Sequence, residues 1–444
     1  MAVWDALQEK KIYSRVVFLF GTADAVGLTE LDGCVGHHGA QGCQMGCNIK
    51  GRHKPSSGHY CAAHLCPNDL VSNDCNHPDY NFRLPPRDPS PETYKINLAK
   101  VTSSRDQTEY EQNQKRTGIN KPSILNGTNP RLMLSVPKCF TVDLMHLGSP
   151  NISELFIPLF RGILRCDPMD DKATWDWAML VGETWIEHGK LVAAATCYFL
   201  SSFHRPPRNT AEKISSGYKV TEYYFYIHGL GPAFFRAVLP RKYWRNFCKM
   251  VHGFCIIVQQ KVTGRQLQEA HVILTSFVEE YENLYYQRHV DRLHFCRPCL
   301  HTLLHLATEC ACVGPAAYTT QFTMECAIGD LGKDLRQPSN IFSNFCQVAL
   351  RRSQLNTLKN ACPELDPDFT RTLPKHTYDC GGDLIFLRPR DRYQTELSRR
   401  ELEAVKRKFN ISRLHRWGRV RLLNGQIAHS LFSEKGKRPN IRIS

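Results

Sequence analysis

The stretch from His301 to Asn340 constrains this chain most, because it joins two candidate metal ligands to a helix that carries a carboxylate beside cations. His301 and His305 lie four residues apart at its start. A second helical segment follows, with Glu325 at its head, and ends at Pro338 because proline cannot continue a helix. Four apolar residues at helical spacing predict a face of this segment that packs against a core: Met324, Ile328, Leu331 and Leu335.

Glu325 borders that apolar face, so its carboxylate is predicted to lie at the edge of a pocket. Lys333 and Arg336 fall on roughly the same side of the helix. A carboxylate beside cations suits metal-dependent chemistry on a phosphate chain. The alternative is a surface helix with salt bridges, and these residues alone favour that simpler interpretation.

Cys43 and Cys47 form the tightest cysteine pair in the N-terminal region, and their C-x3-C spacing is common for half of a zinc site. Such a half-site needs a second pair of ligands, which the distant His301 and His305 could supply. A local set is the alternative: His59, Cys61, His64 and Cys66. The spacing leaves both alternatives open, as well as a chain without metal.

Two acidic positions lie where functional residues often gather. Tyr13 to Phe20 is a short apolar run that predicts a buried strand, and Asp24 follows it, at the expected carboxyl edge of a sheet. An aspartate after a strand is also an ordinary turn residue. Asp143 and His146 are three residues apart, so they share a helical face and either bind a metal or hold each other.

Basic charge is concentrated near the C-terminus. The chain has a net charge of +15, and residues 386–444 contain 16 Lys and Arg against 5 Asp and Glu. This excess predicts attraction to a polyanion, with a solvated basic tail as the alternative. The stretch 204–219 also offers Arg205, Arg208 and Lys213 to a phosphate backbone, although a polar connection explains it more simply.

The 19 cysteines indicate reduced thiols or metal ligands rather than a disulfide framework, because the N-terminal sequence lacks the order of a secretory signal. No apolar run reaches the ~18 residues that a membrane helix needs, so an intracellular protein without a membrane span is expected. With 444 residues, 42% of them hydrophobic, the chain is long enough for two or three domains.

The chain read in order predicts an α/β plus α protein. Residues 2–10 look like the end of a helix, and Thr263-x-x-Gln266 is a capping box that starts a long helix. Asn424-Gly425 predicts a hairpin between two short strands, because both residues tolerate positive φ. Five segments are predicted: a partial core with a Cys/His-rich part (1–82), a polar linker or excursion (83–131), a helical domain (132–300), a return to the core (301–362) and a basic, partly β region (363–444).

Several blocks occur in one order along nearly the whole chain: TADAVGL with the following GHHGAQGC, VPKCFTVDLMHL, DKATWDWAML, FHRPPRNTAEKISSGYK, YYQRHVDRLHFCRPCLHTLLHLA, TMECAIGDLGKDLRQPSN and LLNGQIAHS. In this order they resemble the CACTA (En/Spm-like) DNA transposases, in the form common in mushroom-forming fungi. The resemblance implies a ribonuclease-H-like catalytic core with a large, mainly helical insertion. It also implies a DDE triad of carboxylates that holds two Mg²⁺ or Mn²⁺ ions for DNA cleavage and strand transfer.

Matched residue by residue, Asp24 would be the second Asp of the triad and Glu325 its Glu. Asp143 and His146 match an Asp-x2-His signature near the active site, whose role is open. A Cys pair after the second Asp and a His pair before the Glu recur in the family. The resemblance therefore implies one structural zinc, with four ligands: Cys43, Cys47, His301 and His305.

The implied partner is DNA at transposon terminal repeats, the implied location is the nucleus, and self-association into a homo-oligomer is left open. Candidate contacts to the DNA backbone are Arg205, Arg208, Lys213, Lys333 and Arg336.

The chain departs from the family in three places. No residue matches the first Asp, since Asp5 lies in a helix-like stretch; Cys326 stands where an Arg usually follows the Glu; and the C-terminal β region stops part-way. These departures predict a fragment or decayed copy with little or no strand transfer on its own. They also leave a non-catalytic, zinc-containing DNA-binding protein as the alternative.

Overall fold

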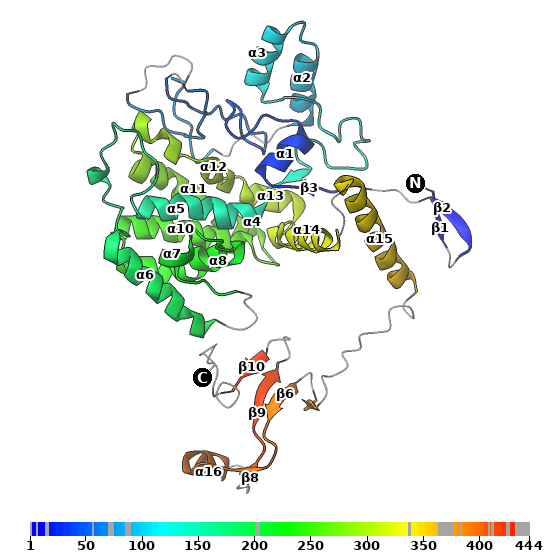
Figure 1. Ribbon diagram of the computed structural model, residues 1–444. Helices are drawn as coiled ribbons and strands as arrows, with labels where there is room; N and C mark the ends of the chain where they lie inside the picture. Colours follow the sequence, from blue (N-terminus) through cyan, green and yellow to red (C-terminus); the bar gives the residue numbers. More distant parts are fainter. Residues whose placement is uncertain are drawn as a thin grey trace. The chain divides into compact units, whose positions relative to one another are not determined.

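The computed structural model describes residues 2–5, 8–13, 17–55, 57–69, 75–84, 90–199, 205–335, 339–362, 376–381, 384–406, 409, 413–422 and 427–430. Helices dominate these ranges, and the sheets are small (Figure 1). Within them, no helix combines the length and the apolar character that a membrane span requires.

The chain divides into two compact units, of which the first comprises Met1–Trp185 and Tyr223–Thr323 and the second Ile186–Glu222 and Met324–Ser444. The segment 132–300, predicted as one helical domain, thus contributes to both units. The main helices of the first unit are α1 (Ala25–Asp32), α2 (Pro91–Thr102), α3 (Gln107–Thr117), α4 (Leu144–His146), α5 (Ile152–Phe160), α9 (Gly231–Phe234), α10 (Arg241–Ile257), α11 (Gly264–Tyr281), α12 (Pro298–Leu303) and α13 (Leu306–Val313).

A core of aromatic rings holds the helical part of the first unit together. The fully buried Phe156 of α5 makes ring contacts with residues of α5, α10, α11 and the π-helical turn η6 (Glu282–Tyr286): Phe160, Phe247, Phe277, Tyr281 and Tyr285. Helices α10 and α11 approach closely, because a Cβ on Gly253 would lie 2.6 Å from Leu274. The capping box predicted at Thr263 is confirmed at the start of α11.

The N-terminal residues form strands rather than the predicted helix end. β1 (Ala2–Asp5) pairs antiparallel with β2 (Lys10–Tyr13). A turn joins them, because the Asp5 carboxylate accepts the N–H of Gln8 and Glu9 adopts a φ of +49°. Local hydrogen bonding by a short polar side chain thus overrides the weak helical pattern.

The buried strand predicted over Tyr13–Phe20 is wrong for the residues that the structure describes. Val17 and Leu19 are exposed, and Phe18 makes a single bridge with Met133. The strand before Asp24 is instead β3 (Gly21–Thr22), which pairs parallel with β4 (Phe140–Thr141). An apolar run shows that a segment is able to be buried, but not that another element covers it.

The segment 83–131, predicted as a polar linker, contains two helices. Ser90 caps α2 through the N–H of Thr93, and Asp106 caps α3 through the N–H of Glu109. The apolar side of α2 is buried against α1 and β4 in one cluster: Leu28, Tyr94, Leu98, Val101, Ile119 and Phe140. Three apolar residues on α2 suffice for this packing, and they are too few to mark a periodic pattern among the polar residues.

The second unit contains α14 (Phe322–Asp334), most of which lies in this unit, and α15 (Ile341–Ala361), α7 (Thr210–Lys213) and α16 (Arg399–Lys406). The predicted core-facing stripe of α14 is wrong, because this helix has no buried residue and Met324 and Ile328 are exposed. Helical spacing determines which residues share a face, but not whether another element covers that face.

The C-terminal sheet is antiparallel throughout, with the strand order β10-β9-β6-β5. Its strands are β5 (Tyr378–Asp379), β6 (Ile385–Arg390), β9 (Trp417–Arg421) and β10 (Ile427–His429). The pairing of β9 with β10 confirms the two strands predicted around Asn424-Gly425, although that dipeptide and residues 431–444 lie outside the described residues.

Asp32, at the end of α1, gives a pH-dependent prediction. It is fully buried, its Oδ1 accepts the N–H of Cys34 at 2.7 Å, and burial raises its pKa from 3.8 to about 6. The folded chain thus holds this proton more tightly than the unfolded chain. The stabilising contribution is complete below pH 3.8 and is lost as the pH rises through about 6.

Asp32→Asn keeps an acceptor oxygen and cannot ionise. We expect this variant to be more stable than the wild type by about 1–3 kcal/mol near about pH 7, with the difference shrinking toward about pH 4.5. Urea unfolding at both pH values measures it. An equal difference at the two values would contradict the assignment.

Candidate metal centre

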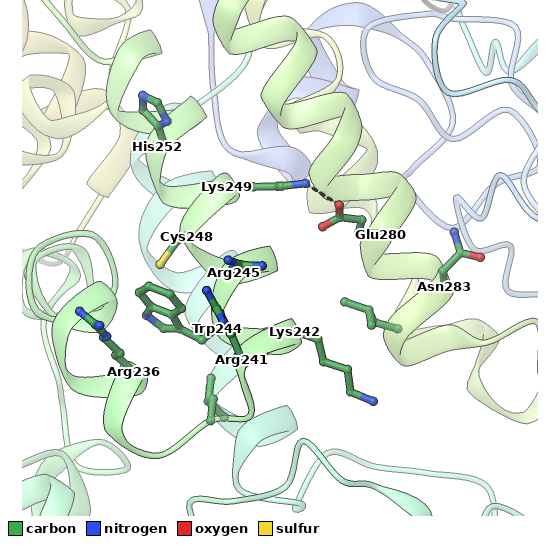
Figure 2. A pocket seen from close by; sticks show the side chains of 12 residues that line it. Arg236, Arg241, Lys242, Trp244, Arg245, Cys248, Lys249, His252, Glu280 and Asn283 are labelled. Atoms are coloured by element: carbon green, nitrogen blue, oxygen red, sulfur yellow. Dashed lines mark hydrogen bonds and ion pairs between the residues drawn. The ribbon is translucent and has the colours of Figure 1, made fainter.

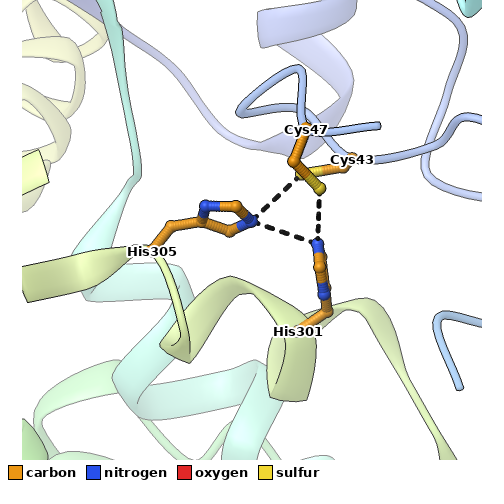
Figure 3. Close-up of side chains that lie close together, drawn as sticks. All are labelled: Cys43, Cys47, His301 and His305. Carbon is orange, nitrogen blue, oxygen red and sulfur yellow. Dashed lines mark hydrogen bonds between the residues drawn. The ribbon is translucent and has the colours of Figure 1, made fainter. Parts of the chain in front are cut away.

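Four side chains from distant parts of the chain meet at one point (Figure 3). Cys43 Sγ lies 3.4 Å from His305 Nε2, and Cys47 Sγ lies 3.1 Å from His301 Nε2. The two Nε2 atoms are 3.1 Å apart, and all four candidate ligand atoms lie within 4.8 Å of one another. Cys43, Cys47, His301 and His305 therefore form a cluster that could hold a metal ion.

The local backbone explains why each pair converges. Gly46 has a φ of +71° and donates its N–H to Cys43 O, so the chain turns back between the two cysteines. A side chain at this position would be strained. His301 lies on α12, which Pro298 starts, and His305 is the residue directly before α13. The short break between these helices turns both imidazoles toward the thiols.

The four ligand atoms lie close enough together to share one cation. A tetrahedral zinc with ordinary Zn–S and Zn–N bonds separates neighbouring N and S ligands by about 3.3–3.6 Å. Three of the six distances between ligand atoms, two Cys–His and one His–His, are 3.1–3.4 Å, and the others do not exceed 4.8 Å. A small cavity of ≈ 30 Å³ borders Cys43 and His301.

The thiols are too close to ionise independently. The hydrogen bond from Cys47 lowers the pKa of Cys43, while the pKa of Cys47 is raised by that bond and by burial. Two neighbouring buried thiolates would repel each other unless a cation lay between them. A divalent cation bound by both sulfurs and both imidazoles removes this cost.

His64 supports the cluster without joining it. Its Nε2 lies 3.4 Å from Nδ1 of His301, which leaves His301 Nε2 facing the thiols. The His64 ring stacks on Phe82 with centroids 4.6 Å apart, and burial lowers its pKa to about 3, so it stays neutral. A partner on the second ring nitrogen orients a metal-binding histidine.

The local alternative for the metal ligands is not supported. Among the residues that the structure describes, the single group with metal-ligand spacing contains Cys43 and Cys47 with the distant histidines. Cys66 instead lies 3.7 Å from Asn76 Oδ1, His59 packs against the His38 ring, and Cys61 forms a backbone bridge with Arg52.

Arg52 organises the Cys/His-rich segment, and no sequence pattern indicated it. Its side chain is fully buried and donates hydrogen bonds to five backbone carbonyls: those of Ala63, His64, Cys75, His77 and Pro78. A guanidinium has five N–H donors, so this set can satisfy all of them. Glu282 holds the same segment from the helical side by accepting the N–H groups of His64 and Leu65.

Asp24 and Asp143 take equivalent positions on neighbouring strands. Each follows by two residues a member of the parallel pair Thr22–Thr141. Asp24 is exposed and caps α1 by accepting the N–H of Gly27. Both carboxylates thus come from the carboxyl end of this short parallel ribbon, where sites in such sheets gather.

Asp143 is buried and already has partners. Its Oδ1 accepts the N–H groups of Met145 and His146, and its Oδ2 contacts His146 Nδ1. The hydrogen-bonded pair is therefore the arrangement found, and it caps α4. Glu309, which the sequence did not indicate, accepts the N–H of Val142 next to it, and burial raises the pKa of Glu309 to about 7.

Glu325 is exposed on α14, in the second unit, whereas Asp24 belongs to the first. Lys333 is exposed as well and pairs with Asp330 at 2.9 Å. Arg336 lies outside the described residues. The salt-bridged surface helix is thus the local arrangement of the described part of this segment.

The loop predicted to contact DNA through Arg208 uses this side chain internally. Arg208 donates two hydrogen bonds to the buried carboxylate of Glu222 and a third to Gly217 O. Arg205 lies 3.8 Å from the same carboxylate, and Lys213 is exposed on α7. The structure therefore favours the simpler interpretation of this stretch, an ordered polar connection.

Comparison with known proteins finds no relative of this chain. No protein-family model matches it, and a search of curated proteins returns no match.

Proposed function

We propose that this chain is a DNA transposase-related protein of the DDE type, with a ribonuclease-H-like core, a helical insertion and one structural zinc. The observation that carries the proposal is the meeting of Cys43 and Cys47 with His301 and His305, although Cys47 and His301 are 254 positions apart in the chain. The resemblance implies these four residues as one ligand set, and local spacing cannot select them.

Zinc is the metal that these ligands suit best. Two thiolates and two imidazoles in a tetrahedral arrangement are typical of structural zinc, with no position left for substrate. Mg²⁺ and Mn²⁺ prefer oxygen ligands, so a catalytic ion would bind elsewhere. The zinc would instead tie the loop after α1 to α12 and α13.

This zinc would have a structural role in the proposed enzyme. Asp24 caps α1, and the same loop region continues to Cys43, so a zinc would fix the backbone near Asp24 relative to the end of the helical insertion. The short parallel pair β3–β4 presents Asp24 and Asp143 at one edge, where the proposed core would need acidic residues. By the resemblance, Asp24 and Glu325 would hold a divalent ion, which would supply the positive charge that activates a phosphodiester for cleavage.

The alternative is a zinc-containing DNA-binding protein without chemistry. Three observations favour it: Asp24 is engaged as a helix cap, Glu325 is exposed, and Cys326 replaces the Arg of the family pattern. It shares the zinc and the DNA with the first proposal. It differs in that Asp24 and Glu325 would not share a cation.

Iron-mediated backbone cleavage tests this difference without requiring turnover. Fe²⁺ that replaces Mg²⁺, with ascorbate and peroxide, cuts the chain next to its ligands. We expect cuts beside both Asp24 and Glu325, suppressed by excess Mg²⁺, and a loss of Fe²⁺ affinity of at least about tenfold in Glu325→Gln, because a ligand is removed. Asp334→Asn, which changes another exposed carboxylate of α14, is the matched control and should leave both cuts unchanged.

Cuts beside Asp24 that persist in Glu325→Gln would show that the two residues do not share an ion, and they would favour the non-catalytic alternative. The absence of cuts at both positions would do the same. Nicking of a plasmid that carries transposon terminal repeats, with Mg²⁺ and the same variants, is the second measurement. Little strand transfer from this chain alone stays a prediction.

A further inference from the structure

A groove open to solvent lies along α10 and α11 (Figure 2). It shares no lining residue with the metal cluster. Its volume is ≈ 1340 Å³. The residues that line it come from η5 (Phe235–Ala237), from α10, and from the end of α11 with η6. None of them was among the candidate DNA contacts in the sequence.

The lining is strongly basic. It contains five Lys or Arg side chains and one carboxylate: Arg236, Arg241, Lys242, Arg245, Lys249 and Glu280. Lys249 pairs with Glu280, and Lys242 pairs with Asp176 at 2.8 Å. Among the residues that the structure describes, Arg236, Arg241 and Arg245 make no ion pair, so their charge remains available to a ligand.

These cations follow one face of a rigid helix. Arg241, Arg245, Lys249 and His252 recur at intervals of three or four residues along α10. The step from Arg241 to His252 covers about 17 Å of helix axis at ~1.5 Å per residue, which is roughly half a turn of B-DNA. The opposite face of α10 is buried through Phe247, so the basic face cannot rotate away.

Trp244 lines the groove, and its side chain already has two partners. Its indole N–H donates to Pro232 O at 2.7 Å, and the Arg236 guanidinium lies 5.4 Å from its ring centre. The ring therefore holds Arg236 in place by a cation–π contact. Single-stranded nucleic acid is usually bound by stacking on free aromatic rings, so this groove suits a phosphate backbone better.

We infer that this groove, defined by Arg236, Arg241, Arg245 and Lys249, binds the phosphodiester backbone of double-stranded DNA without reading its sequence. The inference deepens the proposed function, on which it rests, by assigning the DNA partner to a surface of the first unit. Guanidinium groups bind phosphate oxygens through paired hydrogen bonds, and each neutralised phosphate releases counterions. The contact is therefore strongly dependent on salt.

The experiment measures binding of a fluorescent 20-base-pair duplex of random sequence to the full chain, by anisotropy, over a series of salt concentrations and without Mg²⁺. The double variant Arg241→Ala and Arg245→Ala should bind at least about tenfold more weakly near physiological salt. The slope of log affinity against log salt should fall by about 2, because two phosphate contacts are lost. The double variant Arg241→Lys and Arg245→Lys keeps both charges and should keep the slope.

The matched control is Lys261→Ala with Arg265→Ala, which removes the same charge from an exposed position at the start of α11 outside the groove. It should leave the salt slope unchanged. An equal loss of duplex affinity in this control and in the Arg241→Ala and Arg245→Ala variant would overturn the inference, because overall charge would then explain the binding. Tighter binding of single-stranded DNA or of an acidic peptide than of the duplex would also overturn it.

The outcome is separable from that of the proposed function. Loss of duplex binding in the groove variant, combined with no shared ion at Asp24 and Glu325, would leave the groove assigned and reject the nuclease. Full duplex binding in the groove variant, combined with a shared ion, would reject the groove and leave the nuclease.

Discussion

Chelation of the proposed zinc from the purified chain is expected to lower the midpoint of thermal unfolding of the first unit by roughly 10 °C or more. Structural zinc contributes apparent binding free energies of about 10–16 kcal/mol in small zinc domains. A loss of about 6 kcal/mol shifts the midpoint by ~10 °C for a unit of roughly 300 residues, because the entropy of unfolding is about 2.1 cal/mol/K per residue. The helical core keeps its aromatic packing, so we expect partial rather than complete unfolding.

Single substitutions locate the effect. The wild type should contain one equivalent of zinc per chain, and His301→Ala should contain close to none and show the same loss of thermal stability. Cys66→Ser is the matched control, because Cys66 belongs to the local alternative and lies outside the cluster. It should keep the metal. An unchanged zinc content in His301→Ala would reject the four-residue site.

Arg52→Met is expected to destabilise the first unit by about 3–5 kcal/mol, because it leaves buried carbonyl groups without their donor. Methionine has a similar length but no donor, whereas Arg52 serves five carbonyls and is fully buried. Arg52→Lys should rescue little of this loss. An ammonium has three donors and lacks the planar fork that reaches all five acceptors.

Chemical unfolding of the zinc-bound protein measures the change in stability. Arg83→Met is the matched control, since Arg83 is an exposed arginine directly after the Cys/His-rich part of the chain, and it should change stability by less than about 0.5 kcal/mol. Zinc release to a competing chelator should also become faster in Arg52→Met, because His64, whose carbonyl Arg52 holds, contacts His301. Equal stability of the Arg52 and Arg83 variants would contradict the role assigned to Arg52.

Short-range pattern was enough for the elements whose signals are local. The capping box at Thr263 and the strands β9 and β10 lie where the sequence predicts them. Each depends on residues within a few positions of one another: a side-chain cap or a turn. Such interactions form in much the same way whatever the rest of the chain does.

The metal cluster could be predicted from the sequence only in part. Spacing alone identified Cys43–Cys47 and His301–His305 as pairs, since each pair is held by a local turn. It could not choose between the distant histidines and the local set around Cys61, because residue spacing carries no information on which loops meet. The resemblance pointed to the distant pair, and the fold brings that pair to the thiols.

Only the tertiary structure decided which groups are buried and what covers them. Arg52 and Glu309 look like ordinary surface residues in the sequence, yet both are buried where they satisfy backbone groups. The stripe on α14 and the run before Asp24 look like core, yet neither contains a buried residue in the parts that the structure describes. The physical reason is that local periodicity sets the direction of side chains, whereas burial and pairing depend on contacts between segments far apart in the chain.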